Sequence, residues 1–150
     1  MSRTTARTAA MQMIFEKVAG GQGGEDTLQM VYEELREQRP ENADPLGTDE
    51  PDAEDREYIS RALEGVLTHR EELDRKIAGA AKGWTLERMS LVDLTILRLA
   101  LWEIQYVDEV PDRVAISEAL QLTERYSDPE DKPFVNGILG TLQRGKEEKA

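Results

Sequence analysis

The stretch that decides the fold is RMSLVDLTILRLALWEIQYV, residues 88–107. It is apolar on nearly every face of a helix, and Asp93 and Arg98 are the only charged residues between Arg88 and Glu103. A helix with so little polar surface belongs inside a protein, so this stretch predicts the central helix of a bundle. Asp93 and Arg98 can be interpreted as a satisfied polar pair or as two exposed edge positions, and the pattern does not decide between them.

The residues after this stretch predict two more helices. Pro111 is suited to a helix start, because its fixed backbone angle already fits the first turn. Beyond it, one apolar stripe is formed by Ala115, Ala119, Leu122 and Tyr126. The sequence SDPED, residues 127–131, then interrupts the chain, and a last helix is expected to begin near Lys132.

The start of that last helix, DKPFVNGIL at residues 131–139, carries two conflicting signals. Asn136-Gly137 between apolar residues is typical of a two-residue hairpin turn. Phe134 and Ile138, however, recur at helical spacing through the same dipeptide. A glycine inside a helix costs about 1 kcal/mol relative to alanine, and it is tolerated where another backbone or a ligand approaches closely. The pattern alone leaves both structures open.

Four further helices are predicted upstream of the central stretch. They are expected at about residues 4–18, 25–37, 59–67 and 73–81, where apolar residues recur with the helical period. The sequence GGQGG, residues 20–24, ends the first of them, since glycine is the preferred helix terminator. With no sustained β alternation, the fold class is all-α with about seven helices.

The net charge of −12 is concentrated in one segment. Residues 41–57 hold eight acidic residues and one arginine, a local charge of −7, so the remaining 133 residues share −5. An acidic, proline-containing loop is expected over about residues 40–55, exposed and mobile because it has little apolar surface to bury. Residues 1–15 contain Arg3 and Arg7 and no acidic residue. The overall acidity therefore does not exclude a nucleic-acid ligand.

Several kinds of chemistry are disfavoured. The absence of cysteine excludes disulfides and thiolate metal sites. The single histidine, His69, makes a catalytic triad or a multi-histidine metal site difficult to build, and we expect it to be half-exposed near a helix end. No nucleotide-binding or hydrolase motif is present. We therefore expect a protein that is not an enzyme and has no cofactor or metal. Without a long apolar segment or a signal peptide, it is expected to be cytoplasmic with no membrane contact.

The N-terminal stretch SRTTARTAAMQ is the first candidate binding segment. Arg3 and Arg7 lie four residues apart and would project from one face of a helix start, with Gln12 on an adjacent face. Two arginines form a small basic patch suited to phosphate contacts. An ordinary solvated N-terminus is the alternative interpretation.

The second candidate binding segment is the start of the last helix. Asn136 offers both a donor and an acceptor to a base edge or to neighbouring backbone. Phe134, beside Lys132, is a candidate stacking platform for a base. In the alternative interpretation, Phe134 and Ile138 belong to the core and Gly137 is a packing contact.

Over nearly its whole length, the sequence resembles the NusB family of transcription antitermination factors. The stretches that carry the resemblance are ARTAAMQMIF (6–15), LVDLTILRLALWEI (91–104), VPDRVAISEALQLTERY (110–126) and FVNGIL (134–139). The resemblance implies one all-α domain made of two packed small helical bundles, over about residues 1–70 and 71–145. It also implies that FVNG lies in a late helix and not in a hairpin.

The resemblance further implies a function and partners. Members of this family pair with the ribosomal protein NusE and bind boxA RNA, a short single-stranded sequence in nascent transcripts. The pair helps RNA polymerase in the transcription elongation complex to resist termination, notably in ribosomal RNA operons. The resemblance leaves a monomer or a homodimer open.

The RNA-binding residues that the resemblance implies are Arg3, Arg7, Gln12, Lys132, Phe134 and Asn136. The chain departs from the family where Thr4 and Thr5 replace frequent arginines and Pro133 replaces a frequent lysine. Each lost phosphate contact weakens RNA binding and reduces its salt dependence. We therefore expect RNA affinity to depend strongly on the ribosomal partner.

Two other functions are weighed against this one. The first is a NusB-like RNA-binding module of the kind fused to ribosomal RNA cytosine methyltransferases, which would need a catalytic domain after the polar tail that ends at Ala150. The second is a helical protein–protein adaptor without RNA contact, which the acidity and the sparse arginines favour.

Overall fold

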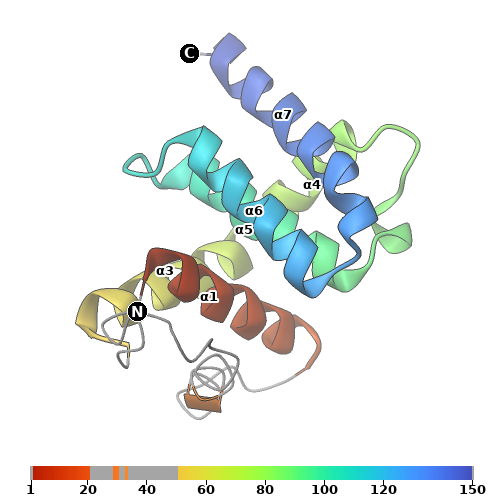
Figure 1. Cartoon of the computed structure of the whole chain (residues 1–150). Helices are drawn as coiled ribbons and strands as arrows, with labels where there is room; N and C mark the ends of the chain where they lie inside the picture. The colour runs from red at the N-terminus through yellow and green to blue at the C-terminus, as the bar shows by residue number, and fades with distance from the viewer. Residues whose placement is uncertain (1, 21–28, 31–32, 34–50, 150) are drawn as a thin grey trace. The chain divides into compact units, whose positions relative to one another are not determined.

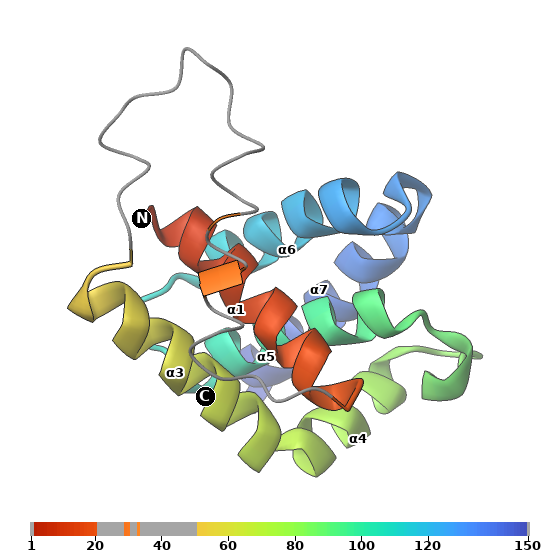
Figure 2. The same cartoon turned by 90° about the horizontal axis from the view of Figure 1, so that it is seen from below.

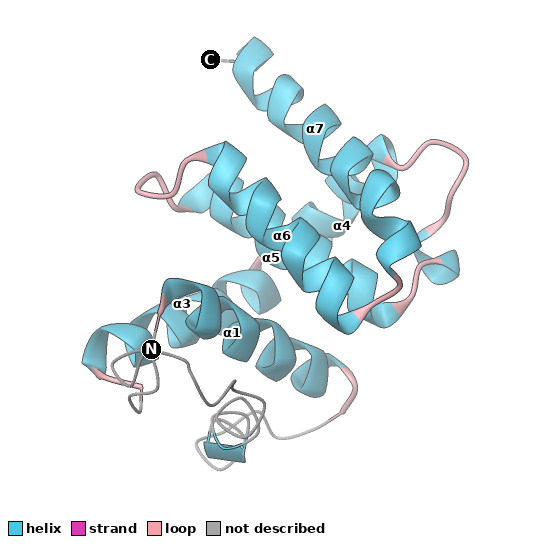
Figure 3. Ribbon diagram, viewed as in Figure 1, coloured by secondary structure: helices cyan, strands magenta, loops and turns pink. Residues whose placement is uncertain are grey.

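The computed structural model describes residues 2–20, 29, 30, 33 and 51–149. Within these residues, the regular secondary structure is entirely helical (Figure 3). The prediction of an all-α fold is therefore confirmed. The chain divides into two compact units, Met1–Gly65 and Val66–Ala150 (Figure 1).

Helix α1 of the first unit runs over Arg3–Val18, as the periodicity predicted. Ser2 caps its start, because the Ser2 hydroxyl accepts a hydrogen bond from the Thr5 backbone N–H at 3.0 Å. The helix ends at Val18, and Gly20 follows with a φ of +105°, a conformation that glycine adopts without strain. The buried face of the helix contains Ala6, Ala9, Ala10, Met13 and Ile14.

The predicted helix at residues 25–37 lies mostly outside the described residues. Only Gln29, Met30 and Glu33 are described there, and all three are helical. Most of the predicted acidic loop, residues 40–55, also lies outside them.

The last residues of that predicted loop form the start of helix α3, Ala53–Thr68, so the loop prediction is wrong from Ala53 onward. Asp52 and Asp55 form a reciprocal cap: the Asp55 N–H donates to Asp52 Oδ1 at 2.8 Å, and the Asp52 N–H donates to Asp55 Oδ2 at 3.0 Å. The hydrogen bond from the Asp55 N–H lowers the pKa of Asp52. Acidic residues here stabilise a helix N-terminus, which the charge count alone did not reveal.

The second unit contains helices α4 (Arg70–Ala80), α5 (Leu91–Tyr106), α6 (Asp112–Tyr126) and α7 (Lys132–Lys149). Two short 3₁₀ helices, η2 (Leu86–Arg88) and η3 (Pro129–Asp131), precede α5 and α7. Helix α5 contacts α4, α6 and α7 (Figures 1 and 2). Every residue from Asp93 to Ile104 is buried, which confirms the prediction of a central helix. No helix in the described ranges is long and apolar enough to cross a membrane.

Neither interpretation of Asp93 and Arg98 is correct, because both side chains are 3% exposed and each has a partner on another element. Arg98 donates to both carboxylate oxygens of Asp74 on α4, from Nε at 2.7 Å and from Nη2 at 3.0 Å. Asp93 accepts from the Ser127 hydroxyl, after α6, at 2.6 Å. Both buried charges are therefore hydrogen-bonded to neighbouring segments, because a buried charge without a partner would be costly.

Helix α7 carries Asn136 and Gly137 in its interior, so the hairpin interpretation is wrong. Val135, Ile138 and Leu139 are buried, at the spacing of one helix face. Asn136 and Gly137 are exposed on the other side. Burial of this apolar stripe outweighs the cost of a glycine in the helix.

Candidate nucleic-acid interface

The N-terminal group of predicted site residues lies on α1, and its members differ in exposure. Arg3 is exposed, and its guanidinium lies 4.4 Å from the centre of the Tyr58 ring on α3. Arg7 is only 4% exposed. Gln12 is half-buried, and its side-chain oxygen accepts no hydrogen bond from the described part of the chain. The helix therefore presents one of its two arginines to solvent.

The burial of Arg7 has a physical reason that the spacing argument missed. Every residue from Ala6 to Met11 is buried, so this part of α1 is covered on all sides. A spacing of four residues places two side chains on the same helix face, but it does not say where along the helix that face becomes covered. Arg3 lies in the first turn, before the covered part begins.

The second group of predicted site residues lies in the first turns of α7. Lys132 is half-buried and its ammonium group donates to Glu124 Oε2 at 3.3 Å. Asn136 and Gly137 are exposed, and a Cβ atom added to Gly137 would meet nothing within 4 Å. The interpretation of Gly137 as a packing contact is therefore wrong for the described residues. The open space above this glycine leaves room for an external ligand.

Phe134 is half-buried and belongs to an aromatic pair that the sequence did not predict. Its ring centre lies 5.6 Å from that of Trp84, with an angle of 59° between the planes. Trp84 follows α4 and is 51% exposed, which is unusual for a tryptophan. Two aromatic rings at a surface, one of them largely exposed, are suited to stacking on unpaired bases.

A cavity of about 310 Å³ opens beside this pair. Its lining consists of Trp84, Arg88, Met89, Ser90, Asp93, Asp131 and Phe134. The site thus combines ring faces, one exposed arginine and two carboxyl groups. Sequence reasoning missed Trp84 and Arg88 because they lie near η2, about fifty residues before Phe134. A tryptophan after a helix-ending glycine was the one signal available.

The two carboxyl groups in this cavity interact. Asp131 has its pKa raised to about 6, chiefly because its carboxyl group hydrogen-bonds to Asp93, and also because of burial and the nearby charges of Asp93, Asp128 and Glu130. Two carboxylates close together cannot both ionise easily, so a shared proton stabilises the pair. At neutral pH, above this pKa, the Asp131 carboxyl group is mostly ionised and adds negative charge and hydrogen-bond acceptors to the cavity.

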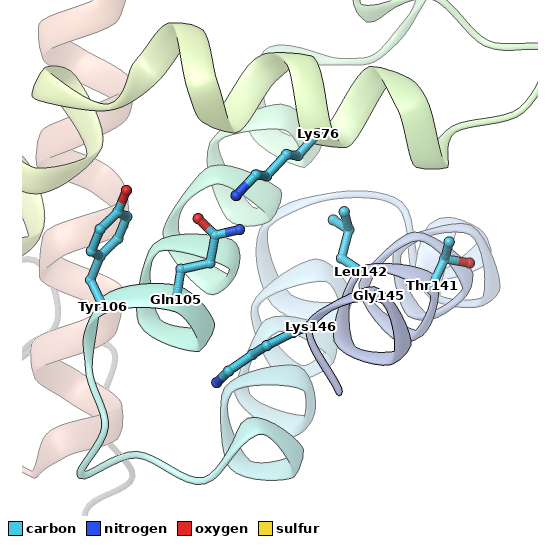
Figure 4. A pocket seen from close by; sticks show the side chains of 7 residues that line it. All are labelled: Lys76, Gln105, Tyr106, Thr141, Leu142, Gly145 and Lys146. Carbon is cyan, nitrogen blue, oxygen red and sulfur yellow. The ribbon is translucent and has the colours of Figure 1, made fainter. Parts of the chain in front are cut away.

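A second cavity, of about 480 Å³, lies among α4, α5 and α7 (Figure 4). Lys76 and Lys146 line it, but both ammonium groups have carboxylate partners. Lys76 pairs with Glu72 at 3.1 Å, and Lys146 pairs with Asp112 at 3.1 Å while also donating to the Ile104 carbonyl at 2.6 Å. None of the predicted site residues lines this cavity.

His69 has a structural environment. It lies between α3 and α4 with its side chain 36% exposed, which confirms the expected half-exposed position at a helix end. Its ring stacks on Tyr106, with centres 4.4 Å apart. The Tyr106 hydroxyl donates to Glu72 Oε2 at 2.8 Å, and this bond lowers the pKa of Glu72. Among the described residues, no group of three or more acidic, histidine or cysteine side chains could hold a metal ion.

The six predicted site residues thus form two groups of three, one in each compact unit. Arg3, Arg7 and Gln12 belong to Met1–Gly65, whereas Lys132, Phe134 and Asn136 belong to Val66–Ala150.

Comparison with known sequences gives a consistent result. The model of the NusB family matches residues 4–144. A transcription antitermination protein NusB from Clostridium botulinum (strain Loch Maree / Type A3) is 35% identical over 142 residues, covering 95% of this chain and 99% of that protein. The transcription antitermination protein NusB of Symbiobacterium thermophilum is 40% identical over 145 residues, covering 97% of this chain and 91% of that protein.

Two solved structures have the same fold. NusB of T. maritima has a TM-score of 0.74 and 26% identity, covering 96% of this chain and 92% of that one. A crystal structure of the antitermination factors NusB and NusE in complex with dsRNA has a TM-score of 0.73 and 22% identity, covering 97% and 99%. At 22% identity, this second likeness concerns the fold alone.

Proposed function

Since the chain belongs to the NusB family, we propose that it acts in transcription antitermination by binding boxA-type single-stranded RNA together with the ribosomal protein NusE. The RNA–protein assembly acts on the transcription elongation complex with RNA polymerase and supports transcription of ribosomal RNA operons. This role places the protein in the cytoplasm.

The observation that carries the proposal is the exposed start of α7. Asn136 and Gly137 face solvent in the interior of a helix, with open space above the glycine. Phe134 lies three residues, about one turn, before Gly137 on the same helix, and its ring is paired with Trp84. Single-stranded RNA is recognised through stacked bases and hydrogen bonds to their edges. Phe134 and Trp84 offer the stacking surface, and the Asn136 amide offers both a donor and an acceptor.

Phosphate contacts are assigned to basic residues at both sites. Arg3 is exposed at the start of α1, a position where the helix N-terminus adds positive potential. Lys132 lies at the start of α7 and is only weakly held by Glu124 at 3.3 Å. Arg7 is buried and Gln12 is half-buried. Their RNA contacts are proposed from the family resemblance alone.

Dependence on NusE follows from the charge. A chain with a net charge of −12 repels RNA at long range. Of the three cations among the proposed RNA-binding residues, Arg3 is exposed, Lys132 is half-buried and Arg7 is buried. If NusE supplies additional phosphate contacts, the complex should bind RNA much more tightly than the chain alone.

A protein–protein adaptor without RNA contact is the second candidate function. The burial of Arg7 favours this adaptor function, because Arg3 is then the one exposed arginine of the N-terminal motif. An adaptor would bind NusE equally well with and without boxA RNA.

A gel-shift experiment separates the two functions. The full chain is incubated with labelled boxA RNA, or with a scrambled RNA of equal length, in the presence and absence of NusE. The antitermination proposal predicts a ternary complex with boxA RNA that the scrambled RNA does not form. A chain–NusE complex that leaves both RNAs unshifted would support the adaptor.

A further inference from the structure

The first residue of α1 is held by a residue that no motif singled out. The Arg3 guanidinium lies 4.4 Å from the centre of the Tyr58 ring, a cation–π contact between α1 and α3. Tyr58 is only 5% exposed, so its ring is fixed within the fold. Arg3 is exposed, so its side chain is accessible to solvent while its guanidinium lies over the ring.

This contact holds the cation without neutralising it. A ring face attracts a guanidinium electrostatically but leaves its five N–H donors available, whereas a carboxylate partner would occupy two of them. Among the described residues Arg3 has no carboxylate within ion-pair distance, and the first turn of α1 contains no acidic residue. Within the described part of the chain, Arg3 is therefore a positioned cation without a carboxylate partner.

We infer that Tyr58 is a positioning residue for RNA, which holds the Arg3 guanidinium in place so that it can pair with a backbone phosphate. The inference rests on the proposed RNA-binding function. An arginine that is already ordered loses less side-chain freedom on binding, so the ring improves affinity without touching the RNA. This arrangement suits a chain in which threonines occupy the two positions after Arg3.

The test is a double-mutant cycle that uses boxA RNA affinity in the presence of NusE, measured over a range of salt concentrations. The variants are Arg3→Ala, Tyr58→Leu and the double variant of the full chain. Arg3→Ala should reduce the slope of log affinity against log salt by about 1, the value of one phosphate contact. Tyr58→Leu should weaken binding about threefold when Arg3 is present, and should have no further effect when Arg3 is alanine.

Two further variants separate positioning from stability. Tyr58→Phe keeps the ring face and should restore the affinity of the unmodified chain. Ile59→Val alters the neighbouring buried residue of α3 and should lower the melting temperature while leaving RNA affinity unchanged.

Three outcomes would overturn the inference. If Tyr58→Leu weakens RNA affinity equally with and without Arg3, Tyr58 has a structural role only. The same conclusion would follow if Tyr58→Phe did not restore the affinity. In both cases RNA binding by the unmodified chain would leave the proposed function intact. Absence of salt-dependent boxA binding by the unmodified chain with NusE would overturn the proposed function and the inference together.

Discussion

The rings of Phe134 and Trp84 lie 5.6 Å apart, and they bring the start of α7 against the segment that follows α4. If bases stack on this pair, Phe134→Ala should weaken boxA RNA binding by about 1–3 kcal/mol. Phe134→Leu is the matched variant, because it keeps apolar volume but removes the ring. It should lose a similar part of the affinity with a smaller drop in melting temperature. If Phe134→Leu binds RNA normally and only Phe134→Ala unfolds early, Phe134 is a core residue and its stacking role is wrong.

Replacing Gly137 by alanine should have opposite effects on the stability of α7 and on RNA affinity. A Cβ atom at this position meets nothing within 4 Å, so Gly137→Ala should stabilise α7 by about 1 kcal/mol, as alanine does in a helix interior. If RNA approaches the backbone there, the same change should weaken RNA binding. Gly79→Ala on α4 is the control, since its added Cβ also meets nothing. Thermal melts and RNA titrations of both variants check this, and unchanged affinity in Gly137→Ala would contradict close approach of RNA.

The ion pair between Arg98 and Asp74 should be important for stability. Its two hydrogen bonds measure 2.7 and 3.0 Å, and Arg98 is 3% exposed. Removing one partner leaves a buried charge, so Asp74→Ala should cost about 3 kcal/mol in urea unfolding. Replacing both residues, as Asp74→Leu with Arg98→Met, should recover much of this loss. If the double variant is as unstable as Asp74→Ala, the ion pair itself stabilises the fold, and the loss is not due only to an unpaired buried charge.

Asp131 should make a pH-dependent contribution to the folding stability of the chain. Its pKa is raised to about 6 by its hydrogen bond to Asp93, so the folded state holds this proton more tightly than the unfolded chain does. The resulting stabilisation is fully present below the unfolded pKa of 3.8 and is lost as the pH rises through about 6.

Asp131→Asn removes this titration and should therefore gain stability, relative to the unmodified chain, as the pH rises. Urea unfolding of both proteins at about pH 4.5 and about pH 7.5 measures the difference. A stability difference that does not change between these two pH values would mean that Asp131 and Asp93 do not share a proton.

Much of the fold could be predicted from the sequence because apolar periodicity reports burial directly. The stretch at residues 88–107 predicted a central helix, and α5 is buried from Asp93 to Ile104. The partners of Asp93 and Arg98 could not be predicted, since Ser127 and Asp74 lie 34 and 24 residues away in the sequence. Pairings over such distances depend on the tertiary arrangement and leave no local pattern.

The candidate site was predicted less completely than the fold. The resemblance indicated α1 and the start of α7, but helical spacing could not distinguish exposed Arg3 from buried Arg7. The hairpin signal of Asn136-Gly137 was overridden by the buried stripe of α7, as local preferences are when a larger apolar surface can be covered. Trp84 and Tyr58 were missed because each acts through a ring contact with a residue distant in the sequence.

The most direct test of RNA binding is fluorescence anisotropy of labelled boxA RNA, titrated with the chain alone, with NusE alone and with an equimolar mixture of the two, at a low and a high salt concentration. The proposed function predicts weak, salt-sensitive binding by the chain alone and much tighter binding by the mixture, because NusE adds phosphate contacts. Binding by the mixture that equals binding by NusE alone, at both salt concentrations, would contradict it.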